Sequence, residues 1–122
     1  PGTASGLFYY TWGQLGTDAN VDRLDAKIVV QGANIPVTET AEQTLHDRGV
    51  VSIPDFIANA GGLICGSVEL QGGSADDALA LVRDKVAANT RTVLDRAATG
   101  RTTPRAAGDA LARQRIRAAA SQ

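Results

Sequence analysis

The sequence lacks methionine, has a single cysteine, and contains no apolar run that approaches the length of a membrane-spanning helix. Such a helix needs about 20 apolar residues, and no basic-then-apolar leader resembles a signal peptide. Cys65 has no second cysteine for an internal disulfide, so nothing indicates an oxidising compartment. The 13 acidic and 12 basic residues nearly cancel, which favours neither nucleic acid nor a membrane surface. We therefore expect a cytoplasmic protein that binds no metal, no nucleic acid and no membrane.

The 122 residues, 43% of them hydrophobic, are enough for one modest core. Because the chain starts at Pro1 and has no methionine, we expect it to be a fragment of a longer protein. The first 25 residues are the hardest to interpret. The aromatic run 7–12 favours a strand, and residues 18–24 favour a short helix.

A strand–helix–strand pattern begins at residue 27. Residues 27–31 are a continuous β-branched run, typical of a strand covered on both faces. Thr38 can cap a helix over 39–48, and Gly49 supplies its left-handed stop. A second β-favouring run covers 50–54. The pattern predicts a βαβ unit in a parallel sheet, and hence an α/β fold with a partial Rossmann-like sheet.

The second half of the chain is predicted to be mainly helical. Ser74 and Asp77 resemble a capping box that opens a helix to about residue 98, with Gly100 as its stop. Thr103, followed by proline, begins the last helix. The predicted apolar faces comprise Leu79, Val82, Val86, Val93 and Ala97, then Ala107, Leu111 and Ile116. We therefore divide the chain into residues 1–73, half of a nucleotide-binding domain, and 74–122, helices that pack on it.

Two loops follow the predicted strands and combine asparagine with glycine. They are residues 32–34 and the small-residue loop 55–62. Ligands of open parallel sheets bind beyond the carboxyl ends of the strands, and an asparagine amide can pair with another amide such as the carboxamide of nicotinamide. Asparagine and glycine are also ordinary turn residues, so this pattern alone leaves a structural role open.

Longer segments carry a family resemblance. Residues 26–38 resemble "A-K-I-V-V-E-G-A-N-x-P-T-T", and residues 48–62 resemble "R-G-I-x-V-x-P-D-x-x-A-N-A-G-G". Residues 105–116 resemble a terminal helix written "R-x-A-A-x-x-L-A-x-x-R-I". All three strings are typical of the glutamate/leucine/phenylalanine/valine dehydrogenase family, and the likeness runs from about residue 20 to residue 119.

The resemblance implies oxidative deamination of an L-amino acid to a 2-oxo acid and ammonia, with NAD or NADP as cofactor, in a homo-oligomer. It implies that the family's catalytic lysine and aspartate lie in a separate N-terminal domain, so we expect no catalytic residue here and an inactive fragment. The phosphate-binding Gly-x-Gly-x-x-Gly turn is also missing. The implied cofactor-binding residues are Gly32, Ala33, Asn34 and Asn59. The implied substrate-binding residues are Asn59, Gly61, Gly62, Leu63 and Gly66.

The expected substrate pocket departs from the glutamate-specific pattern. Gly66 stands where those members carry a serine that holds the substrate carboxylate, and Leu63 lies three residues before it. We therefore expect an apolar or branched amino acid over glutamate, with the neighbouring Ser67 as an alternative source of the hydroxyl. A second possibility is a non-catalytic Rossmann-like module for oligomerisation or regulation.

Overall fold

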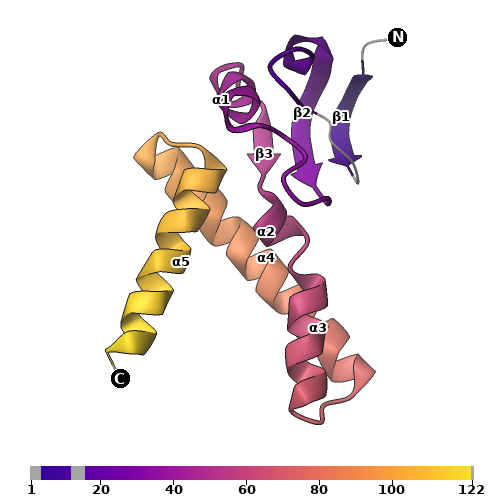
Figure 1. The fold of residues 1–122 in the computed structure, drawn as a ribbon, viewed down its shortest axis with the longest axis vertical. Helices are drawn as coiled ribbons and strands as arrows, with labels where there is room; N and C mark the ends of the chain where they lie inside the picture. The colour runs from indigo at the N-terminus through magenta and orange to yellow at the C-terminus, as the bar shows by residue number, and fades with distance from the viewer. Residues whose placement is uncertain (1–3, 12–15, 122) are drawn as a thin grey trace.

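A computed structural model describes residues 4–11 and 16–121, and it contains a three-stranded parallel sheet followed by helices (Figure 1). The strands are β1 (Ala4–Thr11), β2 (Leu24–Gln31) and β3 (Val51–Ile53), in spatial order β1-β2-β3. Ile28 pairs with Phe8 on one side and with Val51 on the other, so β2 is central. The predicted α/β fold with a parallel sheet is confirmed.

The first part of the chain agrees with the expected elements in outline. β1 contains most of the predicted aromatic strand, and Trp12 lies outside the described residues. The short helix expected over 18–24 is a single 3-10 turn, η1 (Val21–Arg23). β2 starts at Leu24, three residues earlier than predicted. Towards its carboxyl end, Val29 is fully buried and Val30 on the opposite face is half-buried, so both sheet faces are covered there.

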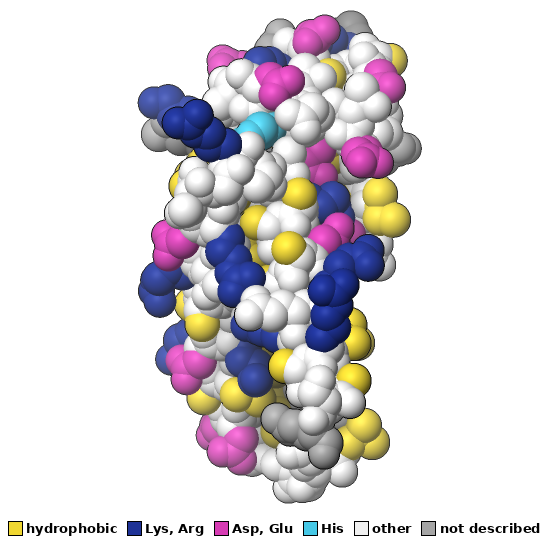
Figure 2. Space-filling model, turned by 90° about the vertical axis from the view of Figure 1, so that its left-hand side faces the viewer, with side chains coloured by type: hydrophobic (Ala, Val, Ile, Leu, Met, Phe, Trp, Pro, Cys, Tyr) yellow, Lys and Arg dark blue, Asp and Glu magenta, His cyan; other side chains and the backbone are white. Residues whose placement is uncertain are grey.

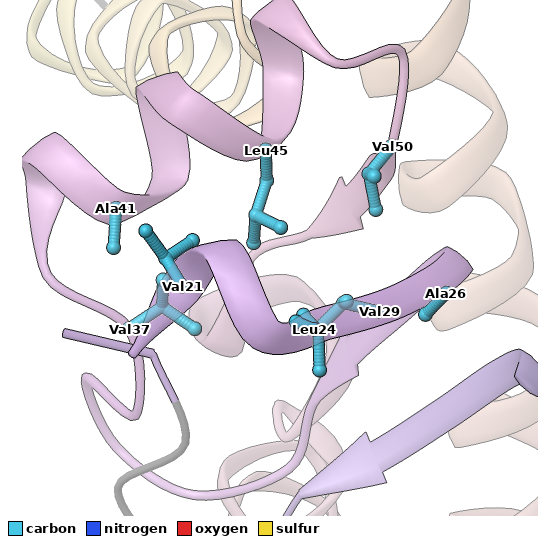
Figure 3. Close-up of a cluster of buried hydrophobic side chains, with 8 residues drawn as sticks. All are labelled: Val21, Leu24, Ala26, Val29, Val37, Ala41, Leu45 and Val50. Carbon is cyan, nitrogen blue, oxygen red and sulfur yellow. The ribbon is translucent and has the colours of Figure 1, made fainter. Parts of the chain in front are cut away.

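Helix α1 (Glu39–Asp47) covers the sheet and forms the first core. Thr38 caps it, since its hydroxyl accepts a hydrogen bond from the amide of Ala41 at 3.2 Å. Gly49 has a φ of +79°, the left-handed conformation that ends the helix, as predicted. In Figure 3 the side chains of this core converge between α1 and β2. Its members are Val21, Leu24, Ala26, Val29, Val37, Ala41, Leu45 and Val50.

The segment 55–62, predicted to be a loop, is largely helical. It forms α2 (Asp55–Ala58) and the start of α3 (Gly61–Leu70). The prediction was wrong because small residues and glycines favour turns locally, whereas tertiary packing decides here. Ile57 is only 7% exposed in a second core that also contains residues of the C-terminal helices, and this burial stabilises the helical turn.

The C-terminal half consists of α4 (Ala75–Gly100) and α5 (Pro104–Ala120), which cross as the two long helices of Figure 1. The capping box of Ser74 and Asp77 is present, and Thr103 caps α5. Gly100 was predicted as the stop of α4, and it is the last residue of that helix. The left-handed residue that reverses the chain is Arg101, the C-cap of α4, with a φ of +51°.

The two helices bury only part of their predicted apolar faces. Val93, Ala97, Ala107 and Leu111 lie in the second core together with Ile57. Leu79 is 62% exposed, on a part of α4 that runs beside α3 (Figure 1), and Ile116 near the end of α5 is 69% exposed. Helix α4 contacts α2 and α3, and helix α5 contacts β3. The division into residues 1–73 and 74–122 stays a prediction.

The face formed by the helices carries a mixed charge. Figure 2 shows Lys and Arg side chains spread over it, with acidic and hydrophobic side chains between them. Within the described residues no helix is both long and apolar enough to cross a membrane, and no group of acidic, histidine or cysteine side chains could hold a metal ion.

Candidate functional site

The two predicted asparagines meet at the carboxyl edge of the sheet. The side-chain amide of Asn59, at the end of α2, donates to the Asn34 side-chain carbonyl at 2.8 Å. Asn34 follows β2 and is exposed, whereas Asn59 is half-buried. This hydrogen bond uses the amino group of Asn59 and the carbonyl of Asn34. The amino group of Asn34 and the side-chain carbonyl of Asn59 take no part in it. Both loops lie at the carboxyl edge, where their places after β2 and β3 led us to expect them, and their binding role stays a prediction.

The loop that carries Asn34 is conformationally strained. Ile35 has a φ of +47°, which is rare for a β-branched residue. Such a conformation costs about 1–3 kcal/mol. The Ile35 amide donates to Asp55 Oδ2 at 2.9 Å, and Pro36 beside it is buried. Gly32 is buried and Ala33 half-buried, so the exposed part of the loop is limited to Asn34 and Ile35.

Beneath the two asparagines lies a buried polar network centred on Arg105 of α5. Its Nε donates to Glu42 Oε2 at 2.5 Å, and its Nη2 donates to Gln31 Oε1 at 3.0 Å and Asp55 Oδ1 at 2.9 Å. Gln31 in turn donates to Glu42 Oε1 and to the hydroxyl of Ser52. Every buried side-chain polar atom among the described residues has a partner. A fully satisfied network of this kind fixes the relative positions of its members.

The charges in this network are stabilised by one another. Burial alone would raise the pKa of Asp55, but hydrogen bonds from the Ile35 amide and Arg105, together with the Arg105 charge, leave that pKa below its ordinary value. Burial opposes the charge on Arg105 as well, yet Glu42 and Asp55 leave its pKa above the usual value. Asp55 and Arg105 are therefore both ionised at neutral pH. The guanidinium also lies 5.5 Å from the centre of the Phe56 ring, within cation–π range.

The predicted substrate-side residues lie on α3, which starts two residues after Asn59. Leu63 is 84% exposed and lines a shallow hollow together with Gly62 and Gly66, while their role in binding substrate stays a prediction. A Cβ added at Gly62 would meet nothing within 4 Å, and one at Gly61 would make only ordinary contact, so the backbone here is open to approach. The remaining lining residues of the hollow are Ser67, Glu69 and Leu70.

Neither lysine belongs to this site. Lys27 was predicted to begin its strand. Because β2 begins at Leu24 instead, Lys27 lies in the middle of the strand, where it is exposed. It lies four residues before Gln31, which corresponds to about 13 Å along the strand. Lys85 is exposed on α4.

The polar network around Arg105 was not predicted from the sequence. Arg105 and Asp55 stand in the motif strings, and Glu42 in the first turn of α1, but nothing local shows that they meet. The sequence contains one signal of the network, because Gln31 is a polar residue at the end of an apolar strand. In the structure this residue is 0% exposed. A buried amide requires hydrogen-bond partners, and Gln31 has them in Glu42, Ser52 and Arg105.

A family comparison identifies the chain. The model of the glutamate/leucine/phenylalanine/valine dehydrogenase family matches residues 14–122. The chain belongs to this family. Glutamate dehydrogenase of Aeropyrum pernix is 43% identical over 84 residues, which is 64% of this chain and 20% of that protein. Glutamate dehydrogenase B of Halobacterium salinarum is 53% identical over 51 residues, 42% of this chain and 12% of that protein. The chain thus spans about a fifth or less of these curated relatives.

Solved structures show the same fold. L-tryptophan dehydrogenase of Nostoc punctiforme aligns with a TM-score of 0.86 at 22% identity, covering 98% of this chain and 37% of that one. A hetero-hexameric glutamate dehydrogenase of Thermus thermophilus aligns with a TM-score of 0.74 at 24% identity, covering 90% and 28% of the two chains. The fold of this dehydrogenase-family chain is therefore that of part of an amino-acid dehydrogenase.

Proposed function

We propose that the chain is the nicotinamide-side part of an NAD- or NADP-dependent amino-acid dehydrogenase, which converts an L-amino acid to a 2-oxo acid and ammonia. The observation that carries the proposal is the hydrogen-bonded pair of Asn34 and Asn59 at the carboxyl edge of a parallel sheet. Membership of the dehydrogenase family and the names of its relatives support it.

The residues at this edge fit a nicotinamide ring with its carboxamide. The Asn59 carbonyl can accept from the carboxamide amino group, and the exposed Asn34 amide can reach the adjoining ribose. Gly62, which is exposed, leaves space for the substrate to approach the ring. When bound, the cofactor would supply the acceptor for the hydride of the substrate. This chain's residues hold and orient the ring, and orientation is a large part of catalysis because it brings the reacting atoms together.

We further propose that the substrate is an apolar or branched amino acid. The hollow on α3 presents Leu63 and Gly66, and Glu69 is the one charged residue among those that line it. An acidic side chain disfavours the second carboxylate of glutamate, whereas an apolar surface accepts a hydrocarbon side chain. The relatives by sequence are named glutamate dehydrogenases, and a structural neighbour is a tryptophan dehydrogenase, so the family name alone leaves the choice among amino acids open.

The test is the initial rate of NADH and NADPH formation by the full-length gene product with leucine, valine, phenylalanine and glutamate. We expect turnover with at least one L-amino acid, and a higher kcat/KM for an apolar one. A clear preference for glutamate would overturn the substrate proposal, and the absence of amino-acid oxidation with either cofactor would overturn the function itself.

We also propose that the full-length gene product self-associates. A structural neighbour is titled a hetero-hexamer, and Leu79 and Ile116 of this chain, which lie outside the hollow on α3, are both more than 60% exposed. Large exposed apolar side chains are typical of surfaces that another domain or subunit covers. The mass of the full-length gene product in solution, measured by light scattering, tests this: we expect a multiple of the subunit mass.

A further inference from the structure

We propose that Arg105 is a positioning residue, which holds the Asn34 and Asn59 loops at the separation that the nicotinamide requires. This inference rests on the proposed function. Arg105 does not itself belong to the asparagine pair, and it lies on the C-terminal helix α5, far away in sequence. It acts through Asp55, which lies at the start of α2, the helix that Asn59 ends, and which contacts the loop of Asn34.

Asp55 is the common anchor of the two asparagines. Its Oδ2 accepts from the amide of Ile35, the residue next to Asn34, at 2.9 Å. Its main-chain carbonyl accepts from the amide of Asn59 at 2.8 Å. One residue thus fixes the backbone on both sides of the bond between the Asn34 and Asn59 side chains. A shift of Asp55 therefore moves both loops.

Arg105 in turn fixes the position of Asp55. Its Nη2 donates to Asp55 Oδ1 and Gln31 Oε1, and its Nε donates to Glu42. One planar guanidinium thus connects the end of β2, the first turn of α1 and the start of α2. The Phe56 ring lies 5.5 Å from it. A lysine ammonium is a compact point charge, and it does not reproduce donors spread over a planar group or their stacking on a ring.

The strain at Ile35 makes this support necessary. A β-branched residue with a φ of +47° keeps that conformation only when its surroundings hold it. The hydrogen bond to Asp55 is a contact that does so. When Asp55 loses its Arg105 partner, the Ile35 amide loses a fixed acceptor, and the loop is free to relax towards an ordinary conformation. Asn34 then leaves its position beside Asn59.

The experiment compares Arg105→Lys with Arg115→Lys in the full-length gene product. Arg115 lies on the same helix and donates to Asn89 at 3.0 Å, but this contact is exposed and remote from the asparagines. Three quantities are measured: kcat/KM, the Kd of NAD or NADP, and the Kd of ADP-ribose, or its 2′-phosphate for an NADP enzyme. The last ligand lacks the nicotinamide and reports on the rest of the cofactor site.

For Arg105→Lys we expect kcat/KM to fall by about tenfold to a hundredfold, as when a reacting group is misplaced by about 1 Å. NAD(P) should bind more weakly, while the nicotinamide-free ligand binds within about twofold of wild type. Arg115→Lys should match wild type in all three. Asp55→Asn removes the negative charge that pairs with Arg105. It should likewise weaken the binding of NAD(P) and leave the binding of the nicotinamide-free ligand unchanged.

Two results would overturn the proposal. One is an Arg105→Lys enzyme that behaves like Arg115→Lys. The other is that Arg105→Lys and Asp55→Asn weaken the binding of NAD(P) and of the nicotinamide-free ligand equally. This result would mean that the network supports only folding. Both are distinct from failure of the proposed function, in which wild type itself oxidises no amino acid.

Discussion

Replacing Arg105 by methionine is expected to lower the free energy of unfolding by about 3 kcal/mol. The substitution keeps an apolar stem but leaves two carboxylates without their cation. The Glu42 side chain is 3% exposed and that of Asp55 10%, so neither is well solvated. Breaking a buried ion pair by removing one partner costs about 3–5 kcal/mol. The Arg105 side chain is itself 24% exposed, so we take the low end of that range.

The assay is urea denaturation of the 122-residue chain, followed by circular dichroism. With an m-value of about 1–3 kcal/mol per molar urea, a loss of 3 kcal/mol lowers the midpoint by about 1–3 M. Arg115→Met is the control, because exposed contacts contribute about 0–1 kcal/mol. Adding Glu42→Gln to Arg105→Met should recover part of the loss, since it removes an uncompensated charge. A loss below about 1 kcal/mol, equal to that of the control, would refute the reasoning.

Three further predictions concern the packing of the two cores and the charge on Asp55. Leu45→Ala empties a fully buried position of the first core and should cost about 2–5 kcal/mol in urea denaturation; a loss below 1 kcal/mol would contradict the described core. Gly108→Ala places a methyl group 2.8 Å from the Phe56 ring, and overpacking of this kind costs about 1–3 kcal/mol; Phe56→Leu in the same chain should recover stability, and a more stable Gly108→Ala protein would contradict the close contact. Because Asp55 has a folded-state pKa below its ordinary value, its stabilising effect is complete above about pH 4 and is lost as the pH falls through the lower folded value. Urea midpoints below about pH 4 should therefore fall more steeply for wild type than for Asp55→Asn, and parallel curves would exclude this contribution.

The sheet and its covering helix were predictable because their signals are local. The β-branched runs around Val29 and Val51 and the cap at Thr38 each determine their own element, and all three agree with the structure. The helices α2 and α3 were missed because Gly61 and Gly62 favour a turn locally. α2 packs against both α4 and α5, and α3 lies against α4. A local sequence pattern does not record these contacts.

The asparagine pair was predictable for a topological reason. The carboxyl ends of parallel strands meet at one edge, so residues that follow β2 and β3 are brought together there. The Arg105 network was not predictable in this way. Arg105 is 74 residues from Gln31 and 50 from Asp55, and charged residues of α5 look alike in sequence whether buried or solvated. Only the three-dimensional path of the chain selects Arg105 over Arg113 or Arg115.

The most direct test of the central claim, that this chain holds the nicotinamide, is the effect of Asn59→Ala on kcat/KM for NAD(P) in the full-length gene product. Loss of a hydrogen bond to the carboxamide, with its partner left unsatisfied, corresponds to about 1–3 kcal/mol, or about a fivefold to 150-fold decrease. Asn89→Ala, at a half-buried position on α4 whose contact with Arg115 is exposed, serves as the control and should match wild type. A decrease for Asn59→Ala alone, with unchanged binding of ADP-ribose or its 2′-phosphate, is the predicted result. Equal kcat/KM values for the two variants would contradict the account.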